Sequence, residues 1–294
     1  MTNVKENKPM HKWHLVSVSL LASFMSASCA QAPLAMHPLM PNPQMTQASK
    51  QRPTSPQTRN DDYYAPVSDL TGAQLLQGLS RLSAKRQKSL GYDQARDVLF
   101  GDVEDPSGKN VVVDIYLCKR LTGIDDRASA YSAGMNTEHS WPQSLGAVGV
   151  AQSDIHHLFP SDIKANEIRS SYPFGEVEKS LELLPTLAPS KSKIGYDTRG
   201  NMVFEPVDSN KGNIARALLY FYMRYAAPTG VQVPNPSLAN FVKERDTLIK
   251  WHEQDPVDAA EMFRNGTIHK GQGNRNPFID HPDYVRAIGD FPIN

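Results

Sequence analysis

Cysteine is scarce in this chain. The 294 residues include only two cysteines, Cys29 and Cys118. Cys29 lies in an N-terminal stretch that we expect to be removed, so one cysteine would remain in the folded protein. A single cysteine cannot form an internal disulfide, which excludes a disulfide scaffold and cysteine-based metal sites. We expect Cys118, which lies in an apolar run, to be a small buried hydrophobic residue.

The sequence also lacks an excess of charge of either sign. Its 31 Lys and Arg residues balance 31 Asp and Glu residues. No global basic field therefore marks a nucleic-acid partner, and any phosphate-binding surface must be local. The neutral balance argues against a high-affinity, charge-driven DNA-binding protein more than against an enzyme that must release its product.

No apolar run is long enough to span a bilayer comfortably. The main candidate is an apolar stretch at 15–25, which follows Lys5, Lys8 and Lys12 and precedes small residues at 28–32. This order of a basic start, a short apolar run and small residues is typical of a secretory signal peptide. The sequence therefore predicts export.

We expect residues 1–32 to be the signal peptide and the mature protein to be periplasmic or extracellular. Acylation at Cys29 would give a lipoprotein instead, but residues 25–28 lack the usual leucine of a lipobox, so we prefer the soluble form. Residues 33–66 are rich in Pro, Gln, Met and Ser and have no apolar period, which predicts a disordered linker. Residues 67–294 would then form one domain.

Apolar periodicity predicts an α+β domain that is mostly helical and has a small sheet. Val111 to Leu121 is rich in β-branched and aromatic residues, which favours a strand. The stretch at 271–277, with two glycines and a proline, predicts a loop. Helices are predicted over 71–86, 92–100, 160–168, 213–225, 237–252 and 256–270.

Polar side chains are concentrated beside Trp, Phe and Pro in segments 136–144, 153–175 and 272–284. The first contains Glu138-His139. A histidine near neutral pKa can take a proton from water, and a neighbouring carboxylate can bind a hard cation through oxygen. Adjacent side chains on a strand point to opposite faces, so the pair could share a site only at a strand end or an irregular turn. Taken alone, the dipeptide is a weak signal.

The second segment contains Asn166, whose amide oxygen is also a suitable ligand for a hard cation. A short helix beginning near Pro160 would bring Asn166 beside the end of the strand. Arg169 and Arg275 are the candidates for phosphate contacts, because the guanidinium fork matches phosphate oxygens. Structural ion pairs with Asp162 or Asp280 are the alternative roles for these arginines.

Asp154, His156 and His157 invite a different interpretation. Together with His139, the two histidines could bind zinc. A structural role for these side chains is favoured over zinc binding, since Leu158 and Phe159 indicate a core nearby.

Taken together, the segments resemble the bacterial endonuclease I family of ββα-metal (His-Me finger) nucleases and their extracellular ribonuclease relatives. The resemblance continues through 211–225 and 248–285 and covers most of the chain from about residue 70 to 290. Each motif is modest alone, but their order and spacing are specific. Some relatives have several disulfides, which this chain is not expected to have.

The resemblance implies a strand–loop–strand–helix site in which His139 is the general base. It implies that Glu138 and Asn166 bind Mg²⁺, for which Mn²⁺ or Ca²⁺ can substitute. Some relatives carry an arginine in a long insertion after the catalytic histidine, but residues 140–153 contain none. Arg169 and Arg275 therefore remain the candidates for stabilising the phosphate.

The leading hypothesis is a secreted, sequence-nonspecific, metal-dependent endonuclease that leaves 5′-phosphate ends. It would act as a monomer on the phosphate backbone of DNA, with RNA as an open second substrate. One alternative is a zinc-dependent phosphatase or phosphodiesterase built on His139, His156 and His157, which tightly bound zinc would favour. Another is an exported, non-catalytic nucleic-acid-binding protein, which would bind without cutting.

Overall fold

The computed structural model describes residues 61–181, 184, 191–228 and 236–293. The expected signal peptide, Cys29 and residues 33–60 of the expected linker lie outside the described residues. The first described helix, α1, lies at the end of the linker segment, and its Tyr63 and Tyr64 side chains are buried. Within the described ranges, no helix has the length and apolarity needed to cross a membrane.

The described chain is an α+β domain in which helices predominate, as predicted. The helices are α1 (Asp61–Tyr64), α2 (Gly72–Arg86), α3 (Tyr92–Val98), α4 (Arg127–Ser132), α5 (Ile163–Arg169), α6 (Lys211–Phe221), α7 (Phe241–Gln254), α8 (Ala259–Gln272), α9 (Pro277–Asp280) and α10 (Tyr284–Ile288). The predicted helices at 71–86, 213–225, 237–252 and 256–270 correspond to α2, α6, α7 and α8.

Three small antiparallel sheets complete the fold where one was expected. Their strands are β1 (Val111–Val113) with β2 (Arg120–Thr122), β3 (Met135–His139) with β4 (Leu158–Asp162), and β5 (Lys179–Ser180) with β6 (Lys193–Tyr196) and β7 (Met202–Glu205). The sheet β5–β6–β7 was not expected from the sequence.

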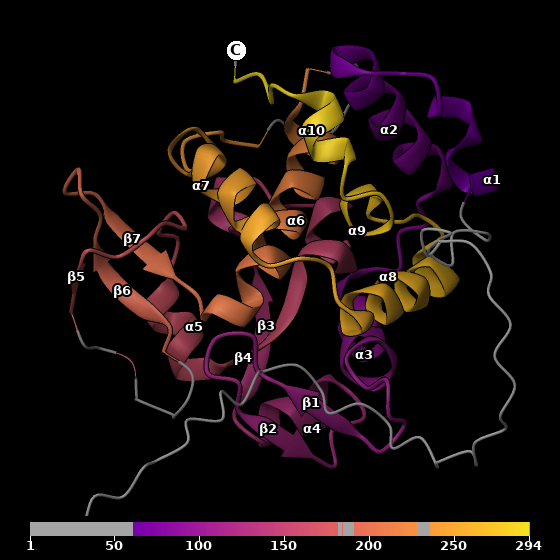
Figure 1. The fold of residues 1–294 in the computed structure, drawn as a ribbon. Coiled ribbons are helices and arrows are strands. Elements are labelled where there is room, and N and C mark those ends of the chain that lie inside the picture. Colours follow the sequence, from indigo (N-terminus) through magenta and orange to yellow (C-terminus); the bar gives the residue numbers. More distant parts are fainter. Residues whose placement is uncertain (1–60, 182–183, 185–190, 229–235, 294) are drawn as a thin grey trace, which may run out of the picture.

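Helix α6 is the centre of the domain. All its residues except Asn213 are buried, and a helix that is buried on every side must be surrounded by other elements. Figure 1 shows α6 behind α7, with α2 and α10 above it, β3–β4 below it and the sheet β5–β7 to one side. A smaller core that includes Leu99, Met135 and Leu158 lies apart from the one around α6. The pair β3–β4 is therefore held between two packed regions.

The prediction of one continuous strand over Val111–Leu121 is wrong, because residues 114–119 do not belong to a strand. The chain forms β1, turns, and returns as β2, with Val112 opposite Leu121. Asp114 causes the turn, because its carboxylate accepts hydrogen bonds from the backbone N–H groups of Tyr116 and Leu117. Residues 115–117 are apolar because they enter the core.

The prediction that Cys118 is a small buried residue without a disulfide is also wrong. This residue is disulfide-bonded in the structure. Cys118 is half-buried and has a φ of 52°, so it lies in the turn between β1 and β2 rather than inside a strand. The expectation failed because the apolar run around Cys118 does not form one continuous strand.

Candidate active site

The strands β3 and β4 and the helix α5 bring the conspicuous residues of the first two segments together. Glu138 lies opposite Phe159 and His139 opposite Leu158 in the antiparallel register. The predicted helix at 160–168 begins later than expected, because residues 160–162 complete β4. Helix α5 then starts at Ile163, where the Asp162 carboxylate accepts hydrogen bonds from two backbone N–H groups of the first turn. Glu138 and His139 therefore lie at the end of a strand, beside this helix.

His139 is held in one tautomer by a backbone carbonyl. Its Nε2 lies 3.1 Å from the Gln152 carbonyl oxygen. A carbonyl oxygen only accepts hydrogen bonds, so Nε2 carries the proton and Nδ1 keeps a lone pair when the ring is neutral. Burial lowers the pKa of His139 to about 3, so the neutral ring predominates at physiological pH. The Gln143 amide nitrogen lies 3.4 Å from Nδ1. Nδ1 is thus available to accept a proton.

Glu138 faces the other side of the strand and is 2% exposed. Its Oε1 lies 3.3 Å from Nε of Arg169 and has no hydrogen-bond partner among the described residues. Burial raises the pKa of Glu138, while the Arg169 charge and the Tyr116 hydroxyl oppose this rise. A buried carboxylate oxygen whose only partner in the described chain is the Arg169 guanidinium is a candidate ligand for a cation.

Asn166 supplies a second oxygen on the Glu138 side of β3. Its amide nitrogen donates to Asn136 Oδ1 at 2.8 Å, which leaves Asn166 Oδ1 as an acceptor. Asn136 and Glu138 lie two residues apart and so share one face of the strand, while Asn166 and Arg169 share one face of α5. One carboxylate and one amide oxygen fit a Mg²⁺ site that keeps several waters.

Arg169 acts inside the protein rather than at its surface. It is 2% exposed, and Nη2 donates to the Ser140 carbonyl at 2.7 Å while Nη1 donates to the Ser170 carbonyl at 2.9 Å. Its guanidinium also lies 4.6 Å from the centre of the Phe174 ring. Arg169 therefore fixes the position of Glu138 and the end of β3.

Arg275 lies in a separate ion pair, which was the alternative role considered for it. Its Nε and Nη2 atoms donate to the two carboxylate oxygens of Asp280 at 2.6 and 2.7 Å. Its backbone N–H donates to the Tyr63 hydroxyl. These contacts connect the loop before α9 to α1, and the structure does not join Arg275 to Glu138, His139 or Asn166.

His156 and His157 are both buried and serve the packing. The His157 Nε2 lies 2.7 Å from the Ala151 carbonyl oxygen, and its ring contacts the rings of Phe221 and His139. The His156 ring lies against Tyr220, 4.6 Å between centres. In the part of the chain that the structure describes, no three His, Cys, Asp or Glu side chains are placed to hold a metal. The zinc interpretation therefore finds no support in the geometry.

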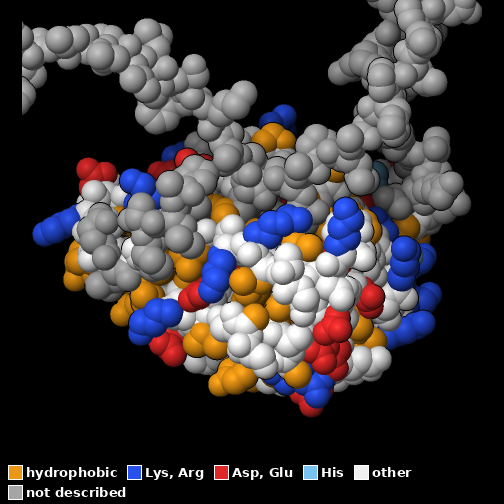
Figure 2. Space-filling view, turned by 90° about the horizontal axis from the view of Figure 1, so that it is seen from below, with side chains coloured by type: hydrophobic (Ala, Val, Ile, Leu, Met, Phe, Trp, Pro, Cys, Tyr) orange, Lys and Arg blue, Asp and Glu red, His pale blue; other side chains and the backbone are white. Residues whose placement is uncertain are grey.

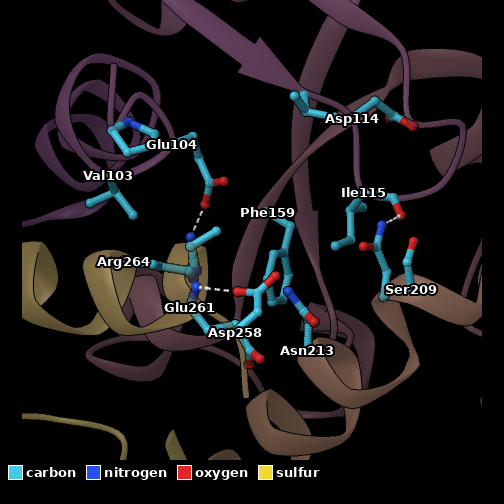
Figure 3. Close-up of a pocket in the computed structure, with 14 residues that line it drawn as sticks. Val103, Glu104, Asp114, Ile115, Phe159, Ser209, Asn213, Asp258, Glu261 and Arg264 are labelled. Atoms are coloured by element: carbon cyan, nitrogen blue, oxygen red, sulfur yellow. Dashed lines mark hydrogen bonds and ion pairs between the residues drawn. The ribbon is translucent and has the colours of Figure 1, made fainter. Parts of the chain in front are cut away.

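A polar cavity of about 80 Å³ lies between β1, α6 and α8 (Figure 3). Two of its acidic side chains form ion pairs, Glu104 with Arg264 and Glu261 with Arg216. The other two, Asp114 and Asp258, accept hydrogen bonds from backbone N–H groups. Arg264 also donates to the carbonyl oxygens of Ile155 and Leu158 at 2.6 Å. The cavity thus belongs to the scaffold that supports β4.

Sequence reasoning missed several residues around His139. Gln152 orients the ring, Gln143 approaches its free nitrogen, and Tyr92 lies against it with 5.5 Å between ring centres. Of these residues, only Gln143 lies close to His139 in the sequence, four positions after it. Nothing in the spacing places Tyr92, at the start of α3, beside residue 139.

Comparison with known proteins shows the family of this chain. The Endonuclease I family matches residues 71–283. The extracellular ribonuclease of Bacillus amyloliquefaciens is 32% identical over 249 residues, which cover 80% of each chain. The extracellular ribonuclease of Bacillus subtilis (strain 168) is 32% identical, over 80% of this chain and 81% of its own. An extracellular deoxyribonuclease of Aeromonas hydrophila is 31% identical over 44% of this chain and 50% of its own. This chain belongs to the endonuclease I family and is an endonuclease.

Proposed function

We propose that this protein is an exported, sequence-nonspecific endonuclease that hydrolyses phosphodiester bonds and leaves 5′-phosphate ends. The observation that carries the proposal is the His139 ring, whose Nε2 is paired with the Gln152 carbonyl so that Nδ1 can accept a proton. Glu138 and Asn166, on the neighbouring elements, supply oxygen ligands for a divalent cation.

In the proposed reaction, His139 Nδ1 takes a proton from a water molecule as the water oxygen bonds to phosphorus. The bond from phosphorus to the 3′-oxygen breaks, and that oxygen takes a proton from solvent. General-base assistance of this kind contributes roughly 10²–10⁴-fold to the rate. The Gln152 carbonyl stabilises the imidazolium that forms, because its partner Nε2 keeps its proton throughout.

Glu138 and Asn166 would bind Mg²⁺, with Mn²⁺ or Ca²⁺ as substitutes, because both ligands offer oxygen. When bound, the cation neutralises the charge that develops on the phosphate and the leaving oxygen. Arg169 holds the Glu138 carboxylate in place for this role, with 3.3 Å between Nε and Oε1. A ββα-metal motif built from β3, β4 and α5 is therefore part of the proposal.

The substrate is proposed to be DNA or RNA recognised through its backbone. The names of the relatives include both ribonucleases and deoxyribonucleases, and two of them are extracellular ribonucleases that align over most of their length. Figure 2 shows basic side chains dispersed over the face below β1, β2 and α4, without one continuous basic patch. This agrees with an enzyme that grips phosphate locally and releases its product.

Export is proposed for the same protein. Residues 1–32 have the order of a signal peptide, and several relatives are named extracellular or periplasmic nucleases. We propose a soluble periplasmic or extracellular monomer, with a lipid anchor at Cys29 as the less favoured form.

The test is cleavage of plasmid DNA and of RNA by the purified protein, with Mg²⁺ and with EDTA. We expect cleavage only with the metal, and a loss of about 10²–10⁴-fold in His139→Ala. His252→Ala is a matched control, because His252 is also buried and its Nε2 also pairs with a backbone carbonyl, that of Pro282 at 3.0 Å. Undiminished cleavage by His139→Ala would refute the proposed base, and binding without cleavage would favour a non-catalytic protein.

A further inference from the structure

The His139 side of the site is walled by helix α3. The Tyr92 ring lies 5.5 Å from the His139 ring, and the Arg96 guanidinium carbon lies 4.3 Å from the centre of the Tyr92 ring. Tyr92 and Arg96 are four residues apart on one helix and so lie on the same face. The three side chains form a row that runs from the proposed base to a guanidinium.

Arg96 is the more accessible of the two arginines near this site, with a side chain 29% exposed against 2% for Arg169. Its Nε is buried and finds no hydrogen-bond partner among the described residues. Its Nη2 contacts Asp93 at 2.5 Å, and the Asp93 side chain is 68% exposed. Exposed ion pairs of this kind contribute little to stability, so a phosphate can replace Asp93 readily. Arg169, in contrast, is enclosed by carbonyl oxygens and Glu138.

A second unpartnered group lies on the same side of β3. Thr137 shares the face of His139, because it is two residues away along the strand. Its hydroxyl oxygen is buried and has no hydrogen-bond partner in the described chain. A buried polar group left without a partner is destabilising. Two such groups on the side of the base indicate a place that a polar ligand fills during function.

We propose that Arg96 contacts the phosphate that is cleaved and stabilises the negative charge that builds on its non-bridging oxygens. This inference rests on the proposed function. As water bonds to phosphorus and gives its proton to His139, charge accumulates on oxygens that a planar guanidinium can bind with two donors. Tyr92 is a positioning residue, since its ring supports the guanidinium and contacts the base.

Residues 140–153 contain no arginine, and Arg96 takes the phosphate-stabilising role in this proposal. Arg169 and Arg275 are each engaged in a buried ion pair, so neither side chain is free to contact the phosphate.

Steady-state cleavage by Arg96→Ala, Arg96→Lys and Arg127→Ala tests the inference. Arg127 is the matched control, because it is similarly exposed and lies 3.5 Å from the same Asp93. We expect Arg96→Ala to lower kcat by about 10²–10³-fold with a smaller change in KM, since the contact strengthens in the transition state. Added guanidinium should restore part of the lost rate, which a purely structural role would not allow. Arg127→Ala should change kcat by less than about 3-fold, within the range of a surface ion pair.

Equal kcat values in Arg96→Ala and the unsubstituted protein would overturn the inference and leave the proposed function intact, provided that His139→Ala is still inactive. If Arg96→Ala does not fold, Arg96→Lys decides, because lysine keeps the charge but not the fork. A fall of about ten-fold or more in kcat supports the contact, and full activity overturns it. Absence of cleavage by the unsubstituted protein would overturn the proposed function and this inference together.

Discussion

Replacing Asp154 by asparagine should disrupt the buried hydrogen-bond network around this side chain, which supports the strands β3 and β4. Asp154 is fully buried in the short turn before His156. Its two oxygens accept hydrogen bonds from donors on four separate parts of the chain. The donors are Gln87 at 3.0 Å, Tyr220 and Tyr225 at 2.7 Å, Gln272 at 2.7 Å and the His156 backbone N–H at 3.1 Å.

The magnitude follows from this geometry. Burial opposes ionisation of Asp154, but His156, His157 and the hydrogen bonds hold its pKa below the usual value, so the group is charged. Asparagine has the same shape, yet one of its two terminal atoms is a donor and would face other donors. Hydrogen bonds to a charged group contribute about 1.5–3 kcal/mol each, so the loss of two predicts a destabilisation of about 3–6 kcal/mol.

Thermal unfolding measures the effect. In a domain of this size, about 1 kcal/mol corresponds to roughly 2–4 °C, so Tm should fall by about 6–24 °C. Asp246→Asn is the matched control, since the Asp246 side chain is 86% exposed and its replacement should change stability by less than about 0.5 kcal/mol. If Asp154→Asn melts within about 2 °C of that control, the network does not hold the fold together.

Burial raises the pKa of Glu244 to about 7, above its ordinary 4.5, so its stabilising contribution is present below pH 4.5 and is lost as pH rises through 7. The stability of Glu244→Gln relative to wild type should therefore rise by on the order of 2–4 kcal/mol between pH 4 and 8; a constant difference in urea unfolding would contradict this. Arg275→Ala should cost about 3–5 kcal/mol, because it leaves Asp280 buried without its cation. Adding Asp280→Ala should recover part of that loss, and a purely additive double-mutant cycle would count against the pair. Arg169→Lys should raise the Mg²⁺ concentration for half-maximal cleavage by roughly 10–100-fold, since lysine cannot hold Glu138 and two carbonyls together; an unchanged titration would show that Glu138 needs no such support.

The sequence by itself determined the long helices and the family. The apolar spacing in α2 and the continuous apolar run in α6 are local patterns, and they predict helices wherever these later pack. The adjacency of Glu138 and His139, followed by Asn166 and Arg169 at characteristic spacing, carried the resemblance to the endonuclease I family. These signals work because each depends on residues that are neighbours along the chain.

Tertiary structure decided which side chains are free to act. Arg169 and Arg275 looked alike as phosphate ligands, but the first is enclosed beside Glu138 and the second is paired with Asp280. Arg96, which no motif marked, lies in the row of rings that ends at His139. Burial and pairing depend on elements that meet only after folding, and spacing along the chain carries no record of which helix will lie beside β3.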